Sequence, residues 1–267
     1  MIKESDLLWI RKWFEIYTQE YCIGKEKFDS CICLKVVHTK KVVEEILGIG
    51  NSLNLKREEC YLAEITAILH DIGRFVQYAR YHSFSDANTE NHAELGIEVI
   101  RKTGVINRFE IQDRQLIEFA VSHHNKATLP ETDNSKSLFF LKLLRDADKI
   151  DILRVVTDHY SGCHMNSAIE MGIPDVSRIS KAAIKSIIEN KVIKAENVKS
   201  INDFKLLQMS WVFDLNFQKS FEIINERKYL DRIAVSLPNT NSVKQVVSIV
   251  KERLMQNCAN ERSIKNA

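Results

Sequence analysis

The sequence has few of the residues that make tight turns. Of its 267 residues only 8 are Gly and 3 are Pro, so the two types together make up about 4%, against roughly 12% in an average sequence. Strand-rich folds of this size need a tight turn about every 8 to 12 residues, usually built on Gly, Pro, Asn or Asp. The shortage argues against a β-sandwich, a barrel or a glycine-looped nucleotide fold, and it favours long uninterrupted helices.

The chain also lacks an excess of one charge and any long apolar run. Its net charge is +2, which provides no large field of one sign to recruit nucleic acid or an anionic membrane. No apolar run approaches the roughly 18 to 20 residues that span a bilayer, and the first six residues lack the pattern of a signal peptide. We therefore expect a soluble, cytoplasmic protein without a membrane partner.

Cysteine is present but not in patterns that bind metal or form disulfide frameworks. No two cysteines form a C-x-x-C pair, so neither a disulfide scaffold nor a zinc knuckle is indicated. We expect reduced thiols with structural roles. The six are Cys22, Cys31, Cys33, Cys60, Cys163 and Cys258.

Apolar residues recur at spacings of three and four along most of the chain, which predicts helices. The sequence thus predicts an all-α fold with a core over residues 1–160 and a helical extension over 161–267 packed on the same body. Three loop-like stretches interrupt the pattern, at 77–90, 125–135 and 160–176. The predicted helices are 5–21, 34–49, 58–72, 91–103, 109–124, 136–158, 177–190, 202–213, 215–228 and 241–257.

An adjacent imidazole and carboxylate close one of the most apolar predicted helices. His70 and Asp71 follow Ile-Thr-Ala-Ile-Leu, and Gly73 stands where the helix is predicted to stop. An unpaired buried charge costs several kcal/mol, so the pair needs a metal ion or a dense hydrogen-bond network. A lone buried histidine is more often structural. For an adjacent histidine and aspartate, a structural role and a functional role are about equally favoured.

Other histidines lie near helix ends or on apolar faces. His38 shares a stripe with Val42 and Ile46, His92 opens a predicted helix, and His123 and His124 close another. Taken singly, each is more often a surface or capping residue. Together with the acidic run at 146–151 they form the mixed imidazole and carboxylate set that divalent metals prefer.

Helical geometry separates the aspartates of that run. Asp146 projects onto the same arc as Lys142 and Lys149, which predicts a solvated ion-pair partner. Asp148 and Asp151 project among leucines, so Asp148 is the candidate ligand and Asp151 a hydrogen-bond acceptor that orients a ligand. His124 lies closer than His123 to the apolar side of its helix, but the choice between the two stays open.

Four motifs follow one another along the chain. They are His-Asp-Ile-Gly at 70–73, His-Ala-Glu-Leu-Gly at 92–96, His-His-Asn at 123–125 and Asp-Ala-Asp-Lys-Ile-Asp at 146–151. In this order they resemble the HD-domain superfamily of metal-dependent phosphohydrolases. With His38 they cover about residues 34–158. The resemblance implies an all-α, HD-domain-like helical bundle. It also implies a metal ion bound by the four positions that match the family signature: His38, His70, Asp71 and Asp148.

The resemblance extends to the subset of the family that binds two ions. His92 and His124, or His123, match the additional ligand positions, and Asp71 would then bridge the two ions. The complete set favours two divalent ions over one, and its donor types suit Fe, Mn, Co, Ni or Zn. Arg74 stands where some members place a lysine, which implies a phosphate contact. The Gly-rich motif of the cyclic-di-nucleotide phosphodiesterases is missing, which disfavours that substrate.

The function implied is hydrolysis of a phosphate ester by a metal-activated hydroxide, with a nucleotide or another small phosphorylated metabolite as the substrate partner. Asp71, Arg74, His123 and Asp151 are the candidate catalytic residues. His123, if it is not a ligand, could protonate the leaving oxygen, and Lys149 is a further candidate phosphate donor. The stretch 77–90 either lines the substrate entrance or is an ordinary surface loop.

Three other functions stay open at this point. The chain could be a non-catalytic regulator that binds metal or nucleotide, a two-iron oxygenase on the same scaffold, or a helical scaffold protein without metal. The C-terminal region carries no motif that we can assign. Its apolar cluster of Trp211, Phe213, Leu215 and Phe217 is expected to pack in the core, or else to form a face between the copies of a homo-oligomer.

Overall fold

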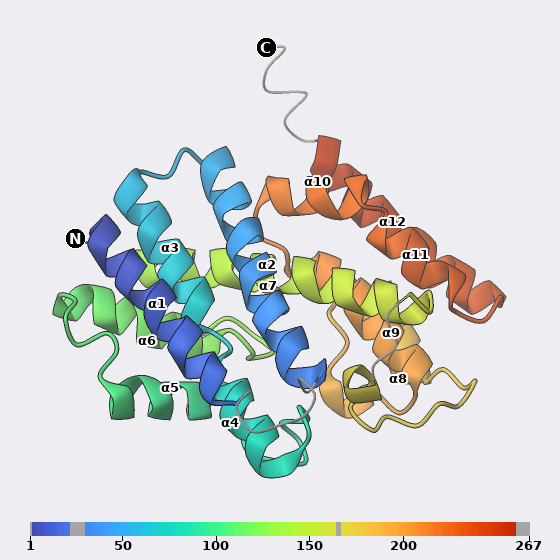
Figure 1. The fold of residues 1–267 in the computed structure, drawn as a ribbon. Coiled ribbons are helices and arrows are strands. Elements are labelled where there is room, and N and C mark those ends of the chain that lie inside the picture. The colour runs from blue at the N-terminus through green and yellow to red at the C-terminus, as the bar shows by residue number, and fades with distance from the viewer. Residues whose placement is uncertain (1, 22–29, 164–166, 260–267) are drawn as a thin grey trace, which may run out of the picture. The chain divides into compact units, whose positions relative to one another are not determined.

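The computed structural model describes residues 2–21, 30–163 and 167–259 of the chain (Figure 1). Throughout these ranges the regular structure is helical and contains no strand. The predicted all-α fold is thereby confirmed. None of the helices in the same ranges combines the length and the apolar character needed to span a bilayer.

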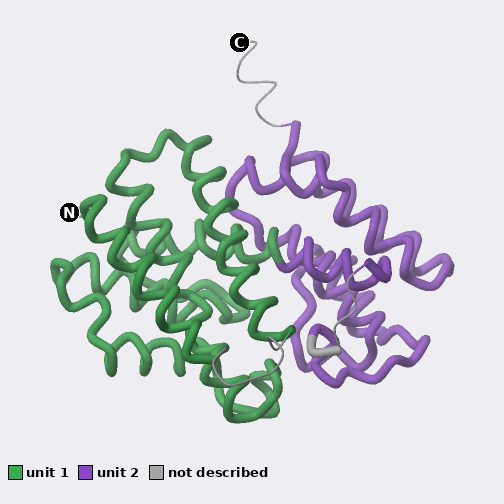
Figure 2. Tube along the Cα trace, in the orientation of Figure 1, with its two compact units in different colours: residues 1–151 green, residues 152–267 purple. Residues whose placement is uncertain are grey.

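The chain divides into two compact units, residues 1–151 and 152–267 (Figure 2). The division falls inside the long helix α7 (Ser135–Tyr160), whereas the sequence pattern suggested a boundary after residue 160. A helix that continues across the division has no loop or composition change to mark it. The packing of the C-terminal region on the same body stays a prediction.

The first unit consists of helices that bury one apolar stripe each. Val42, Ile46 and Ile49 on α2 are fully buried, as the spacing of three and four predicts. Helix α3 packs against α1, α2 and α6, and α4 and α5 pack against each other. Besides the first part of α7, the unit contains α1 (Glu4–Glu20), α2 (Ser30–Ser52), α3 (Arg57–Leu69), α4 (Ile72–Tyr81), α5 (His92–Thr103) and α6 (Ile111–His123).

Helix α4 was missed by the sequence pattern. Residues 77–81, assigned to a loop, are its second half, and Gly73, assigned as a helix stop, lies in its first turn. The chain turns at His70 and Asp71 and starts a new helix at once, with Asp71 at the N-cap position. Gly73 was taken as a helix stop, so the residues after it were not recognised as a second helix.

Gly73 is required by the close approach of α4 to α5. A Cβ atom built on Gly73 would lie 2.0 Å from the carbonyl oxygen of His92 and 2.5 Å from the amide nitrogen of Gly96. Both neighbours are backbone atoms, which cannot turn aside as a flexible side chain can. The absence of a side chain at this position therefore sets how near His92 lies to the His70–Asp71 junction.

The second unit is a smaller set of helices around α12 (Asn241–Ala259), which packs against α8 and α10. Helix α8 starts at Lys181 rather than 177, capped by the Ser180 hydroxyl. The predicted helix 215–228 is shorter at both ends, and the short helix α11 that follows Lys228, whose φ is 54°, was not predicted. The other elements are α8 (Lys181–Ile188), α9 (Ile201–Ser210), α10 (Gln218–Glu226) and α11 (Tyr229–Val235), with 3-10 turns η1 (Ser167–Glu170), η2 (Ala195–Asn197) and η3 (Trp211–Asp214).

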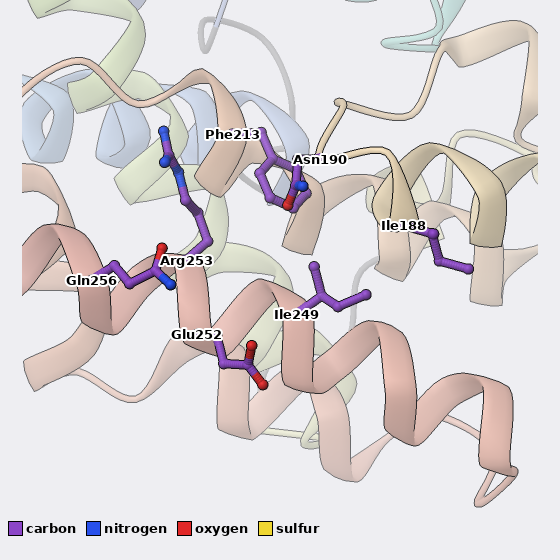
Figure 3. A pocket seen from close by; sticks show the side chains of 7 residues that line it. All are labelled: Ile188, Asn190, Phe213, Ile249, Glu252, Arg253 and Gln256. Atoms are coloured by element: carbon purple, nitrogen blue, oxygen red, sulfur yellow. The ribbon is translucent and has the colours of Figure 1, made fainter.

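A pocket of about 470 Å³ opens in the second unit between α8, η3 and α12 (Figure 3). Phe213 is one of its walls, and like Trp211, Leu215 and Phe217 it is half-buried. The pocket contains no group of metal-binding side chains, and all such groups among the described residues lie in the first unit. Its lining residues are Ile188, Asn190, Phe213, Ile249, Glu252, Arg253 and Gln256.

For three of the cysteines the structure agrees with the expectation of reduced thiols. Cys60, Cys163 and Cys258 are free. Cys22 lies outside the described residues.

The contact between α4 and α5 can be tested with Gly73→Ala. The added methyl group would meet backbone atoms, so we expect the free energy of unfolding to fall by about 1–3 kcal/mol, the usual cost of overpacking a core. Gly48→Ala is the matched control. It lies in helix α2, where a Cβ atom would meet no neighbouring atom within 4 Å, and it should stabilise the protein by up to about 1 kcal/mol. Urea unfolding that shows equal effects for the two would contradict this account.

Candidate metal centre

Four buried histidines of the first unit are held in the same way. In each, the ring nitrogen Nδ1 is tied to an oxygen at the edge of the cluster, which leaves Nε2 pointing inward. A carbonyl oxygen can only accept a hydrogen bond, so His70 and His124 carry their proton on Nδ1. The pairs are His38 Nδ1 with Asp151 Oδ2 (2.7 Å), His70 Nδ1 with the Ala67 carbonyl oxygen (2.6 Å), His92 Nδ1 with Asp86 Oδ2 (2.6 Å) and His124 Nδ1 with the Val121 carbonyl oxygen (2.7 Å).

The inward nitrogens face Asp71. Its Oδ2 atom lies 3.6 Å from His38 Nε2 and 3.8 Å from His70 Nε2. Its Oδ1 atom lies 3.4 Å from His92 Nε2 and 3.9 Å from His124 Nε2. One carboxylate thus stands between two pairs of imidazoles.

Asp148 completes the first of these pairs. Its Oδ1 atom lies 3.1 Å from His38 Nε2 and 3.7 Å from His70 Nε2. Within the described residues the Nε2 atoms of both histidines are buried and lack a hydrogen-bond partner. Buried polar atoms are nearly always satisfied, so two such nitrogens directed at carboxylates fit a bound cation.

These side chains form three overlapping groups of metal-ligand type. In each group one ligand atom per residue lies within 4.8 Å of the others; the groups are His38, His70 and Asp71, then His70, His124 and Asp148, then Asp71, His92 and His124. Together with the contacts of Asp148 they outline two positions, one among His38, His70, Asp71 and Asp148 and the other among Asp71, His92 and His124. Imidazole nitrogen and carboxylate oxygen suit divalent transition metals.

The bend between α3 and α4 places Asp71 at the centre. Because the chain leaves α3 at His70 and enters α4 at Ile72, two consecutive residues can both point inward. The Tyr17 hydroxyl of α1 donates to the Ile72 carbonyl oxygen at 3.0 Å, which ties the bend to the N-terminal helix. His38 is supplied by α2, His92 by the first turn of α5 and His124 by the end of α6.

Helix α7 contributes Asp148 and Asp151, as its projection suggested, but the prediction for Asp146 was wrong. Asp146 is fully buried rather than solvated, and Arg145 and Lys149 on the same arc are buried as well. Arg145 donates to the His124 carbonyl oxygen at 3.0 Å. A helix covered on every side has no solvated arc, so a projection that assumes one assigns its charged residues wrongly.

The surroundings leave two of the imidazoles neutral. Burial and the Arg74 guanidinium lower the pKa of His92. Burial, with the neighbouring His92 and His70 rings, lowers the pKa of His124 to about 3. Near neutral pH both rings therefore present a lone pair, which is the form that binds metal.

The pKa of His38 is shifted in the opposite direction. Burial and the charge of Lys35 lower its pKa, but the carboxylates of Asp148 and Asp151 outweigh both and raise it to about 9. Burial likewise opposes the charge on Asp71, yet Lys35 and the surrounding imidazoles hold the pKa of that carboxyl well below its usual range. A cation bound here would therefore meet charged carboxylates and would displace a proton from His38.

Two residues at the centre were missed by the sequence reasoning. The Lys35 ammonium donates to Asp71 Oδ2 at 2.7 Å; its spacing of three from His38 on one helix was the available signal. Asp86 holds His92 and also accepts from Arg74 and Gln77, at 2.9 Å each. Asp86 lies in the connection between α4 and α5, where no periodicity marks a buried role.

Arg74, expected to contact phosphate, lies beside Asp71 with its Nε atom 3.5 Å from Asp71 Oδ1. Its Nη1 atom donates to the Phe84 carbonyl oxygen at 2.6 Å and to Asp86. The guanidinium thus organises the segment that orients His92. Contact with a phosphate stays a proposal.

His123 is not brought into the cluster. Its Nδ1 atom lies 2.8 Å from the Phe119 carbonyl oxygen, its ring packs on the Phe119 ring at 4.6 Å, and it is half-buried. Of the two adjacent histidines, His124 is the one that faces Asp71. The proton-donating role considered for His123 stays a prediction.

The difference between the two histidines can be measured with His124→Ala and its matched control His123→Ala. Removing His124 takes away one of three side chains around the second position, so we expect the manganese content after reconstitution to fall from two ions per chain to one. His123→Ala should keep both ions. Elemental analysis with the opposite pattern would contradict the assignment.

The role of Asp151 can be tested with Asp151→Asn. An amide keeps the size but loses the charge that orients the His38 ring, and loss of such a supporting partner typically weakens metal binding by roughly 10- to 100-fold. Asp133→Asn, an exposed residue in the loop before α7, should leave affinity unchanged. Calorimetric titration with Mn²⁺ that shows equal affinity for both variants would refute this role.

Comparison with known proteins agrees with this geometry. The family model described as "HD domain" matches residues 36–153, the segment that contains every residue of the three ligand groups. Comparisons with curated proteins and with solved structures find no match. Residues 36–153 of this chain are therefore an HD domain, a domain of the metal-dependent hydrolase superfamily.

Proposed function

We propose that the protein is a metal-dependent phosphohydrolase that uses two divalent ions to cleave a phosphate ester of a nucleotide or another small phosphorylated metabolite. The observation that carries this proposal is the common orientation of the four imidazoles. Each has Nδ1 tied to an outer oxygen and Nε2 directed at Asp71, and Asp148 also faces the Nε2 atoms of His38 and His70.

The candidate ligands fall into two sets, one for each ion position. His38, His70 and Asp148 would hold one ion, His92 and His124 the other, and Asp71 would contact both through its two oxygens. Bound divalent ions supply the activation of water and the neutralisation of phosphate oxygens that such a reaction requires. No Ser or Cys nucleophile is needed in this scheme.

The side chains around the ligands keep the site rigid. Asp151 fixes the ring of His38, and Asp86 fixes that of His92. Asp86 is in turn held by Arg74 and Gln77. Preorganised ligands need no rearrangement when charge develops on a phosphate, and this is the main way in which such sites lower a barrier.

Catalysis can be tested with Asp71→Asn. Losing the carboxylate that both positions share should remove measurable hydrolysis in Mn²⁺-supplemented assays with nucleotides, phosphomonoesters and phosphodiesters, because neither ion would keep its complete ligand set. Asp133→Asn, exposed in the loop before α7, serves as the control and should keep wild-type activity. Turnover by Asp71→Asn equal to that of the control would contradict the mechanism.

The same preparations distinguish the alternative functions. A wild-type protein that binds nucleotide and metal but hydrolyses nothing with any metal would indicate a regulatory role. A mixed-valent iron signal that shifts with a candidate substrate, in the absence of hydrolysis, would indicate oxygenase chemistry on this scaffold.

A further inference from the structure

Lys35 is a half-buried cation in contact with the candidate metal centre. Its Nζ atom lies 2.7 Å from Asp71 Oδ2, and its side chain is only 16% exposed. The oxygen that it contacts is the one that the His38 and His70 Nε2 atoms also face. The ammonium therefore neutralises the carboxylate oxygen that a divalent ion would approach.

Most of the hydrogen-bonding capacity of this ammonium is unused. It has three N–H donors, and within the described residues its hydrogen bond to Asp71 is the one present. The ring of Phe84 also lies near the ammonium, with its centroid 5.4 Å from Nζ. An aromatic face stabilises a cation without fixing the direction of its N–H bonds.

Lys35 and Arg74 lie beside different oxygens of Asp71. Lys35 contacts Oδ2, the Arg74 Nε atom lies 3.5 Å from Oδ1, and within the described residues that Nε atom is buried without a hydrogen-bond partner. Both cations also face the Phe84 ring, Arg74 at 5.9 Å from its centroid. Two donor groups therefore flank the shared carboxylate with N–H bonds still to satisfy.

From this geometry, and resting on the proposed function, we infer that Lys35 binds the terminal phosphate of a phosphomonoester once metal occupies the site. Two cations on one carboxylate oxygen repel each other, so a divalent ion at Asp71 Oδ2 displaces the ammonium. The flexible four-carbon stem allows it to turn toward an incoming anion. Lys35 thus exchanges Asp71 for a phosphate oxygen.

The charge around the site favours a dianion over a monoanion. Two divalent ions with Lys35 and Arg74 exceed the negative charge of Asp71, Asp86, Asp148 and Asp151. A monoester phosphate carries close to two negative charges near pH 7 and presents three terminal oxygens. A diester carries one charge and presents two, so it would use these donors less completely.

The test compares Lys35→Met, which keeps the length and removes the charge, with Lys35→Arg and with the matched control Lys41→Met. Lys41 lies on the same helix and pairs with Glu44 at the surface. In metal-free protein, Lys35→Met should bind the first Mn²⁺ about tenfold more tightly by calorimetry, because the competing cation is gone. Lys41→Met should bind it as the wild type does.

In fully Mn²⁺-loaded protein, Lys35→Met should bind inorganic phosphate at least about tenfold more weakly, the loss expected for one charge-assisted hydrogen bond. Lys35→Arg should restore most of that affinity. Unchanged phosphate binding by Lys35→Met at full metal load, or weaker metal binding by that variant, would overturn the inference.

Substrate preference completes the test and separates this inference from the proposed function. Wild-type protein should turn over a phosphomonoester faster than a phosphodiester, and Lys35→Met should reduce that preference. A wild-type preference for the diester would overturn the monoester assignment. If the wild type hydrolyses neither ester while phosphate binding still depends on Lys35, the phosphohydrolase proposal fails and the binding role of Lys35 stands.

Discussion

The centre depends on one requirement, that both nitrogens of a buried imidazole must be satisfied. When Nδ1 is bonded to an outer oxygen, the ring can neither flip nor change tautomer without losing that bond. His70 and His124 use carbonyl oxygens three residues earlier in their own helices. His38 uses Asp151 of helix α7, and His92 uses Asp86 in the connection that precedes its own helix. All four rings are thereby committed to presenting Nε2 inward.

The position of His92 depends in addition on backbone packing. Its helix can approach the His70–Asp71 junction only because Gly73 has no side chain where α4 meets α5. The connection between these helices then delivers Asp86 to the outer nitrogen of His92, and Arg74 and Gln77 hold Asp86 in place. The glycine, the connection and the two polar residues of α4 together build one half of the centre.

Helix periodicity predicted most of the elements, but it failed where two helices met or where a helix was covered on all sides. Gly73, which lies inside α4, was taken as the end of the preceding helix, so the start of α4 at Ile72 was not recognised. Helix α7 buries Asp146 and Arg145 as well as its leucines, so a projection onto one apolar arc could not identify the solvated side. In both cases the burial of the side chains depends on neighbouring helices, and the sequence of a single helix does not show where those neighbours pack.

The sequence by itself determined the helical class, the chemical types of the ligands and the order in which they occur, because these follow from composition, spacing and residue identity. It could not choose between His123 and His124. Helix ends fray, so helical geometry does not fix which of two adjacent terminal residues faces the core. The tertiary structure turned His124 toward Asp71 and left His123 against Phe119. It also brought Lys35, Asp86 and Asp151 to the ligands, because hydrogen bonds between distant residues exist only once the helices have packed.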